Sequence, residues 1–249
     1  MKEIKIRDLV IGKGRPKICV PIVARTEEEI LSEAECIADS VAELVEWRAD
    51  YCDNLENLES ILKQIRERIG ERPLLFTFRT AAEGGERSIC AKEYSALNQR
   101  AAESKLVDLI DVEAYFAGGL AEKLICEIHE RGGSVIASNH DFHKTPPEEE
   151  LVKRMHHMQQ IGADIAKLAV MPENRTDVLT LMRVTEQMSA RDLRIPLVTM
   201  SMGKLGVISR ISGELTGSSI TFGALGQTSA PGQLEAGNLQ ELLELLSLA

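Results

Sequence analysis

The sequence has 249 residues, of which 44% are hydrophobic and 27% are charged, a composition typical of a globular chain that can fill a core. Its formal net charge of −10 argues against a general binder of nucleic acids or anionic membranes, because both need a basic face. The sequence contains no apolar run of about 18 residues, and its start, MKEIKIRDLV, lacks a signal-peptide core, so we expect a cytoplasmic protein. The scattered cysteines form neither a disulfide framework nor a zinc pattern: Cys19, Cys36, Cys52, Cys90 and Cys126.

Short β-rich segments alternate with helical patterns along the whole chain. The expected strands cover 17–23, 44–50, 73–80, 106–114, 134–139, 164–170, 196–202 and 218–224. The expected helices cover 26–40, about 55–69, about 90–104 and 119–131, and a further helical pattern follows each later strand. Capping boxes, in which a threonine precedes a glutamate by three residues, predict helix starts at Thr26 and at Thr145.

This alternation predicts an α/β fold of the (β/α)₈ TIM-barrel class. About eight strand–helix units fit a chain of this length, and we expect residues 1–249 to form a single barrel domain. Residues 1–15 are expected to form an N-terminal β-hairpin that closes the bottom of the barrel. The competing architecture is a doubly wound open sheet. Such a sheet usually has a glycine-rich phosphate loop after its first strand, and VPIVARTEEE has none.

Charged residues gather where two of the expected strands end. In VEWRAD, Glu46, Arg48 and Asp50 alternate with apolar residues and so share one face of a strand. Arg79 ends the next apolar strand, and Glu83 follows in a loop beside a pair of glycines. In a barrel, the carboxyl ends of strands carry the chemistry. Solvated charge at a strand end and an ordinary glycine-rich turn remain open alternatives for these two segments.

Lys167 lies inside the apolar strand DIAKLAV, where both faces of a barrel strand are buried. Burial of an ammonium is unfavourable by several kcal/mol unless the group is paired or neutralised. Desolvation favours the free amine, which can act as a nucleophile or a base. The pattern predicts a Schiff-base lysine, and the alternative is a lysine paired to a carboxylate in the core.

Two histidines lie three residues apart in SNHDFHKTP. His140 lies at the end of its strand, on the same face as Ile136 and Ser138, and the next strand carries Lys167. Because neighbouring strands are about 4.8 Å apart, we expect His140 and Lys167 to lie side by side. His143 falls in the following loop, so His140 is the predicted functional histidine.

The remaining sequence gives little sign of other chemistry. His129, His156 and His157 lie in helical patterns away from strand ends, and we expect structural or surface roles for them. No set of His, Asp and Glu residues has the spacing of a metal site. The glycines of SMGKLGVISR do not form a phosphate-binding loop.

Five motifs in this order closely resemble the type I 3-dehydroquinate dehydratase family along essentially the whole chain: VEWRAD, FTFRTAAEGGE, SNHDFHKTP, IAKLAVMP and SAPGQL. The resemblance implies a metal-free (β/α)₈ barrel without a cofactor, usually a homodimer. It also implies conversion of the small molecule 3-dehydroquinate to 3-dehydroshikimate and water, a step of the shikimate pathway.

The resemblance further implies a role for each matched residue. Lys167 would form an imine with the substrate ketone, His140 would transfer protons, and Glu83 would orient His140. Substrate hydroxyls would be bound by Glu46, Arg48 and Arg79. The substrate carboxylate would be held by Arg210, Ser229 and Gln233, and the segment 225–233 resembles a lid.

Two alternatives remain beside this resemblance. A class I aldolase also uses a lysine imine in a barrel, but it often keeps a phosphate-binding glycine loop near the last strands. A ligand-binding barrel without activity would be expected to lack the lysine, the histidine or the glutamate, and all three are present.

Overall fold

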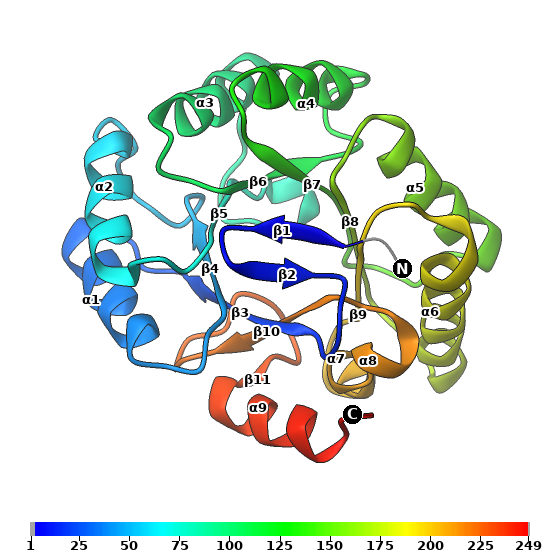
Figure 1. The fold of residues 1–249 in the computed structure, drawn as a ribbon. Coiled ribbons are helices and arrows are strands. Elements are labelled where there is room, and N and C mark those ends of the chain that lie inside the picture. Colours follow the sequence, from blue (N-terminus) through cyan, green and yellow to red (C-terminus); the bar gives the residue numbers. More distant parts are fainter. Residues whose placement is uncertain (1–2, 249) are drawn as a thin grey trace.

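The computed structural model describes residues 3–248, and its centre is a curled sheet of parallel strands (Figure 1). These strands are β3 (Lys17–Ile22), β4 (Leu44–Arg48), β5 (Leu74–Thr77), β6 (Leu109–Glu113), β7 (Ser134–Asp141), β8 (Ile165–Val170), β9 (Leu197–Ser201) and β10 (Ile220–Ala224). Strands β3 to β9 pair with their neighbours in chain order, and β10 returns to pair with β3. Between β9 and β10, a bridge joins Leu197 to Ser218, and the Ser219 amide donates to the Leu197 carbonyl at 2.8 Å. The sheet therefore closes into the predicted barrel.

Helices surround the barrel on its outer side (Figure 1). They are α1 (Glu27–Ala38), α2 (Leu58–Ile69), α3 (Ala91–Ser104), α4 (Leu120–Glu130), α5 (Glu148–Gln160), α6 (Arg175–Gln187), α7 (Ile208–Ile211), α8 (Gly213–Thr216) and α9 (Ala236–Leu245). Most expected boundaries agree to within a few residues. The segment after β9 differs, because its helical pattern is divided between the one-turn helices α7 and α8.

The two predicted capping boxes have opposite outcomes. Thr26 caps α1 as expected, with reciprocal hydrogen bonds between Thr26 and Glu29. The box at Thr145 is wrong, because α5 begins after Pro147 and has no side-chain cap. The Thr145 hydroxyl donates instead to the carbonyl of Met171, which lies after the neighbouring strand. A tertiary hydrogen bond has replaced the local one.

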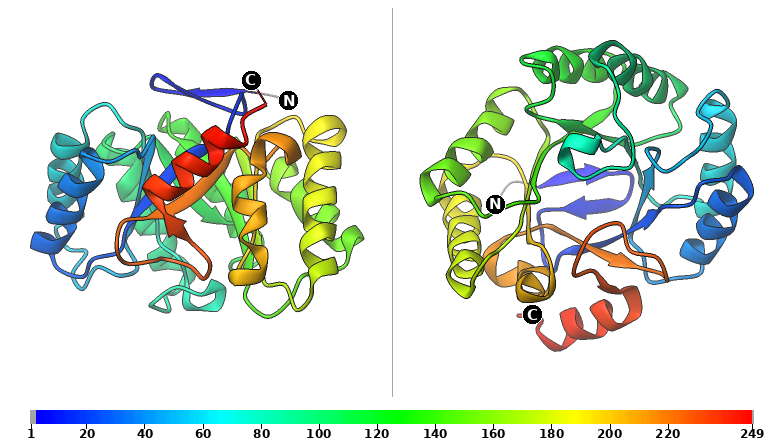
Figure 2. Two further views of the ribbon diagram at one scale, coloured as in Figure 1. Left: turned by 90° about the horizontal axis from the view of Figure 1, so that it is seen from below. Right: turned by 180° about the vertical axis from the view of Figure 1, so that it is seen from behind.

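The N-terminal segment forms the expected hairpin from β1 (Ile4–Ile6) and β2 (Leu9–Ile11). Ile6 and Ile11 pack on the lower lumen residues Leu44, Leu75 and Leu109. Figure 2 (left) shows the hairpin at one end of the barrel and the loops after β5 and β10 at the other. The hairpin therefore closes the end where the strands begin and leaves the opposite end for the site.

Strand alternation produces two separate apolar layers. The larger one lies between the sheet and the helices, where Trp47 and Phe76 pack edge to face with ring centroids 5.7 Å apart. The smaller one lies in the lumen, and most of it fills the lower part. Above that lower layer, lumen positions carry buried charged side chains, including Glu46, Asp111 and Lys167. The fold therefore concentrates buried charged groups toward the open end of the barrel.

Candidate active site

Lys167 on β8 lies in the barrel lumen with its ammonium beside two carboxylates. Its Nζ atom is 3.2 Å from Oδ2 of Asp111 and 3.7 Å from Oε1 of Glu46. The same nitrogen lies 4.5 Å from the centroid of the Phe222 ring. The side chain is only 5% exposed, but it borders the cavity at the strand ends. Lys167 is thus paired to core carboxylates, as in the alternative interpretation, and also faces the cavity.

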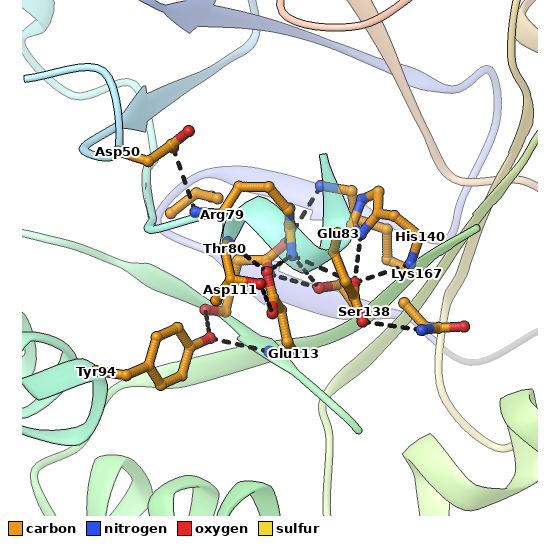
Figure 3. Close-up of polar contacts among 12 residues, drawn as sticks. Asp50, Arg79, Thr80, Glu83, Tyr94, Asp111, Glu113, Ser138, His140 and Lys167 are labelled. Carbon is orange, nitrogen blue, oxygen red and sulfur yellow. Dashed lines mark hydrogen bonds and ion pairs between the residues drawn. The ribbon is translucent and has the colours of Figure 1, made fainter. Parts of the chain in front are cut away.

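His140 lies at the end of β7 and makes two contacts with a single oxygen of Glu83. Oε2 of Glu83 accepts a hydrogen bond from the His140 backbone amide at 2.9 Å and lies 2.9 Å from its Nδ1 atom. Oε1 accepts from the Asn139 side chain at 2.9 Å. Glu83 reaches this position because it ends the short helix η1 (Ala81–Glu83), directly after β5 (Figure 3). The imidazole orientation is therefore fixed by its partner, and Nε2 is left for other contacts.

Burial determines the protonation of this pair. Burial first, and then the positive charges of Arg79, Lys167 and Arg48, lower the pKa of His140 well below its ordinary value of 6.5. Burial raises the pKa of Glu83 to about 8, although Arg79 opposes the shift. The imidazole is therefore neutral at neutral pH, and Glu83 can take up or release a proton in the same range.

Arg79 forms the centre of a buried ion network (Figure 3). Its Nη1 atom donates to Glu113 and to Ser138, each at 3.0 Å, and its Nη2 atom lies 2.8 Å from Oδ2 of Asp111. Glu113 also accepts from the backbone amide and the hydroxyl of Thr80, both at 2.8 Å. This network attaches the segment after β5 to β6 and β7. It therefore fixes the position of Arg79 and Thr80, the residues at which the loop that carries Glu83 begins.

Arg48 at the end of β4 forms a two-pronged ion pair with Asp50. Nε and Nη2 of Arg48 donate to the two carboxylate oxygens at 2.8 and 2.7 Å. Its Nη1 atom lies 3.4 Å from the Ser229 carbonyl of the 225–233 segment. Arg48 therefore connects the barrel to the segment above the cavity.

The 225–233 segment lies over the site and is held by its own side chains. The Ser229 amide donates to Oε1 of Gln233, and Nε2 of Gln233 donates to the Ser229 hydroxyl, both at 2.8 Å. The Pro231 carbonyl accepts from the Gly203 amide at 3.1 Å and from Nη2 of Arg210 at 3.0 Å. Ser229 and Gln233 thereby border the cavity.

Among residues 3–248, buried Arg210 has no carboxylate partner. Its Nε and Nη1 atoms have no hydrogen-bond partner among the described residues. Burial lowers the pKa of Arg210 to about 10. Burial of a cation with unused donors is unfavourable in free energy unless an anion binds beside it. The Arg210 side chain is therefore suited to an anionic ligand below the Pro231 segment.

The cavity brings together most of the residues that the sequence predicted. Its lining includes Glu46, Arg48, Arg79, Glu83, His140, Lys167, Ser229 and Gln233. Arg210 is not part of the lining, and its Nη2 atom donates to the Pro231 carbonyl beside it. His143 is exposed in the loop beyond β7, away from this lining. The structure thus separates the two histidines as expected.

Several residues of the site were missed. Asp111 and Glu113 border Lys167 and Arg79, and the apolar walls come from Phe142, Met200, Met202 and Phe222. The alternation in LIDVEA was a usable signal for the carboxylates, because it repeats the pattern of VEWRAD. The apolar walls had no comparable signal, since methionine and phenylalanine in a strand are typical of any core.

Other kinds of site are not found in the part of the chain that is described. Across residues 3–248, no three His, Cys, Asp or Glu side chains are grouped in a way that could hold a metal ion. Over the same range, no helix has the length and apolar character needed to span a bilayer.

Comparison with known proteins decides the family. The family model described as type I 3-dehydroquinase matches residues 18–249. The chain belongs to the type I 3-dehydroquinase family. The 3-dehydroquinate dehydratase of Clostridium novyi (strain NT) is 45% identical over 249 residues, covering 99% of this chain and 98% of the relative. That of Salmonella agona (strain SL483) is 46% identical over 252 residues and covers all of both chains.

Solved structures of type I 3-dehydroquinases and related dehydratases have the same fold. The type I 3-dehydroquinate dehydratase from Clostridium difficile, solved with covalently modified comenic acid, superposes with a TM-score of 0.95 at 43% identity, covering 99% of this chain and 98% of that one. The 3-dehydroquinate dehydratase from Enterococcus faecalis superposes with a TM-score of 0.91 at 42% identity, covering 98% and 99%. These matches confirm the predicted barrel and family, and they favour the dehydratase interpretation over the aldolase.

Proposed function

We propose that this chain dehydrates 3-dehydroquinate to 3-dehydroshikimate through an imine on Lys167. The observation that carries the proposal is the placement of Lys167 and the Glu83–His140 pair on one cavity at the open end of the barrel. Family membership supplies the substrate. The buried ammonium, the oriented imidazole and the surrounding guanidinium groups are the groups that this reaction requires.

The lysine changes the acidity of the substrate. Once the Lys167 ammonium has released a proton to a base in the cavity, its free amine adds to the C3 ketone, and protonation of the resulting hydroxyl with loss of water gives a protonated imine that withdraws electrons from C2. Removal of the C2 proton then produces an enamine. The enamine expels the C1 hydroxyl, which leaves as water after protonation, and water finally hydrolyses the conjugated imine. The products are the enone, one net water and the regenerated lysine.

His140 is proposed to move the protons in these steps. Its neutral imidazole can accept the C2 proton at Nε2 and can return a proton to the leaving hydroxyl. Glu83 holds Nδ1, and its raised pKa of about 8 lets the pair store one proton near neutral pH. Proton transfer on the substrate thus needs no charged histidine in the resting enzyme.

The remaining groups are proposed to orient the substrate. Glu46, Arg48 and Arg79 line the same cavity as Lys167 and would bind the ring hydroxyls. Arg210 lies just outside the cavity lining against the Pro231 carbonyl, and it would bind the substrate carboxylate with Ser229 and Gln233 once this segment shifts, because its Nε and Nη1 donors are unused. A carboxylate there would neutralise the buried guanidinium and join the 225–233 segment to the barrel, which would exclude water from the imine.

Trapping of the imine tests the proposal. The protein would be incubated with 3-dehydroquinate and reduced with borohydride, the adduct would be mapped by mass spectrometry, and enone absorbance would be followed in parallel. We expect an adduct on Lys167 and rising absorbance, and Lys167→Ala should lose both while staying folded. No adduct with flat absorbance would disprove the proposed substrate, and turnover by Lys167→Ala would disprove the imine. Retro-aldol products without dehydration would favour the aldolase alternative.

We also propose that the enzyme works as a homodimer in the cytoplasm. Exposed large apolar side chains lie on the adjoining helices α6 to α9, on the turn after β9 and on the C-terminal segment: Leu179, Leu205, Ile208, Leu215, Leu245, Leu246 and Leu248. A second copy would bury such a surface. The free state of all five cysteines suits a reducing compartment. Light scattering should give a dimer mass for the wild type and a lower mass for Leu215→Glu, and a monomeric wild type would contradict the proposal.

A further inference from the structure

The carboxylate of Asp50 is fully buried and accepts hydrogen bonds from four N–H groups. Two come from Nε and Nη2 of Arg48, at 2.8 and 2.7 Å. The other two are backbone amides, that of Arg79 at Oδ1 and that of Glu86 at Oδ2, both at 3.2 Å. The side chain thus contacts a guanidinium at the end of β4 and a loop that follows β5.

The two backbone contacts bracket the loop that carries Glu83. Arg79 lies before helix η1, Glu86 lies three residues after Glu83, and the loop between them turns back on itself. The Gly85 amide donates to the Thr80 carbonyl at 2.9 Å. A Cβ atom on Gly85 would lie 2.0 Å from the Arg79 carbonyl oxygen, so only glycine allows this close approach. The Asp50 carboxylate therefore joins the two ends of a tight loop, at the Arg79 and Glu86 amides.

We infer that Asp50 is a positioning residue that couples the orientation of Arg48 to the placement of the Glu83–His140 pair; this inference rests on the proposed function. Asp50 itself is absent from the residues that line the cavity, so it acts through its partners. Its negative charge compensates Arg48, and its geometry fixes the distance between the end of β4 and the loop after β5. A shift of the loop would move Glu83 and, through Oε2, the imidazole of His140.

The four contacts explain why a neutral amide cannot replace this carboxylate. Each Asp50 oxygen accepts from one Arg48 nitrogen and one backbone amide. In Asp50→Asn, one oxygen becomes an NH₂ group that donates, so two N–H groups would face another donor. The buried donors would lose their partner, and the loop or the guanidinium would have to move.

Asp53→Asn is a matched control for this change. Asp53 lies three residues further on, and its carboxylate is 64% exposed and pairs with Arg25 at 3.7 Å. The same chemical change is made on the same rim without contact to Arg48, and Asp53 reaches the Glu83 loop only indirectly, through the exposed Arg25 that also pairs with Glu86 at 3.0 Å. A general effect of lost charge would therefore appear in both variants.

Kinetics and NMR together test the inference. For Asp50→Asn we expect KM to rise about 10-fold through Arg48 and kcat to fall about 10-fold through His140. The imidazole ¹⁵N signals of His140, recorded without substrate, should shift in Asp50→Asn and stay in place in Asp53→Asn. A folded Asp50→Asn with wild-type kcat, KM and imidazole signals would overturn the inference. Equal changes in both variants would also overturn it.

The two readouts separate this inference from the proposed function. If the wild type fails to turn over 3-dehydroquinate, the proposed function fails. The shift of the His140 signals still measures whether Asp50 positions the pair, because it needs no substrate. A double-mutant cycle with Arg48→Lys measures the coupling between the two residues. If Asp50 acts through Arg48, the losses in kcat/KM of the two single variants should be strongly non-additive in the double variant. Additive losses would contradict that part of the inference.

Discussion

Nζ of Lys167 and Nη2 of Arg79 share one oxygen of Asp111, at 3.2 and 2.8 Å respectively. Asp111 is fully buried, and burial alone would raise its pKa. The charges of Arg79 and Lys167, together with a hydrogen bond from Ser138, instead hold the pKa of Asp111 below its ordinary value. Asp111 is thus the counter-ion that allows two cations to lie side by side in the lumen.

Replacement of Asp111 should therefore destabilise the fold. In Asp111→Asn, Lys167 and Arg79 lose their common anion in a buried site, and we expect the free energy of unfolding to fall by about 3 kcal/mol. Denaturant titration measures the change. Glu59→Gln is the control, because the pair of Glu59 with Arg100 is exposed and should contribute under about 1 kcal/mol. Equal losses in both variants would contradict the counter-ion role of Asp111.

The two histidines of SNHDFHKTP should differ sharply in their effect on turnover. His140→Ala removes the imidazole that borders the cavity, and we expect kcat to fall by about 10²- to 10⁴-fold. His143 is exposed in the following loop, so His143→Ala should change kcat by no more than about 3-fold. Steady-state kinetics of both purified variants provides the measurement. Comparable losses would mean that the wrong histidine has been chosen.

The protonation of His140 gives a prediction about pH. Because burial and neighbouring cations lower its pKa well below 6.5, the folded protein leaves this imidazole neutral where the unfolded chain binds a proton. The unfolding free energy should therefore decrease as the pH falls below 6.5, and His140→Gln should reduce that slope. NMR titration should find the His140 ring still neutral at pH 6.5. A midpoint at or above 6.5 would refute the assignment.

The contribution of Glu83 to the free energy of unfolding should depend on pH in the opposite direction. Its pKa is raised from 4.5 to about 8, so the folded chain keeps a proton that the unfolded chain releases near pH 4.5. The resulting stabilisation is complete below pH 4.5 and is lost as the pH rises through about 8. Glu83→Gln cannot titrate, so its unfolding free energy relative to the wild type should rise across that interval, by a few kcal/mol at most.

The same variant should also affect catalysis. Loss of the carboxylate that holds Nδ1 of His140 should lower kcat by about 10- to 100-fold and remove any limb of the pH–rate profile near pH 8. Stability curves and pH–rate profiles of the two proteins test both effects. An unchanged limb near pH 8 would show that another group titrates there.

Local patterns in the sequence were sufficient for the architecture. The alternation of strands and helices predicted the barrel, and the periodicity of each strand predicted which side chains point into the lumen. His140 could be distinguished from His143 because one ends a strand and the other follows it. Lys167 was detectable because an ammonium inside an apolar strand violates the usual pattern.

Contacts between segments that are distant in the sequence could not be predicted from local patterns. The Thr145 box failed because the carbonyl of Met171, 26 residues away, accepts its hydroxyl. Arg210 was expected to act with Ser229 and Gln233, and its hydrogen bond to the Pro231 carbonyl of their segment joins residues 21 apart in the sequence, a contact that no local pattern indicates. Asp50 was noticed only as a charge at a strand end, and its bond to the Glu86 amide depends on how the loop folds back.

The sequence by itself determined the order of the strands, the face of each side chain and the set of reactive groups at the open end, because these follow from local periodicity along one chain. The tertiary structure alone decided which charges neutralise one another. Lys167 and Asp111 are 56 residues apart and meet only when β8 and β6 curve around the same lumen. Ion pairing and burial depend on distances in space, so the protonation of His140 and Glu83 follows from the closed barrel.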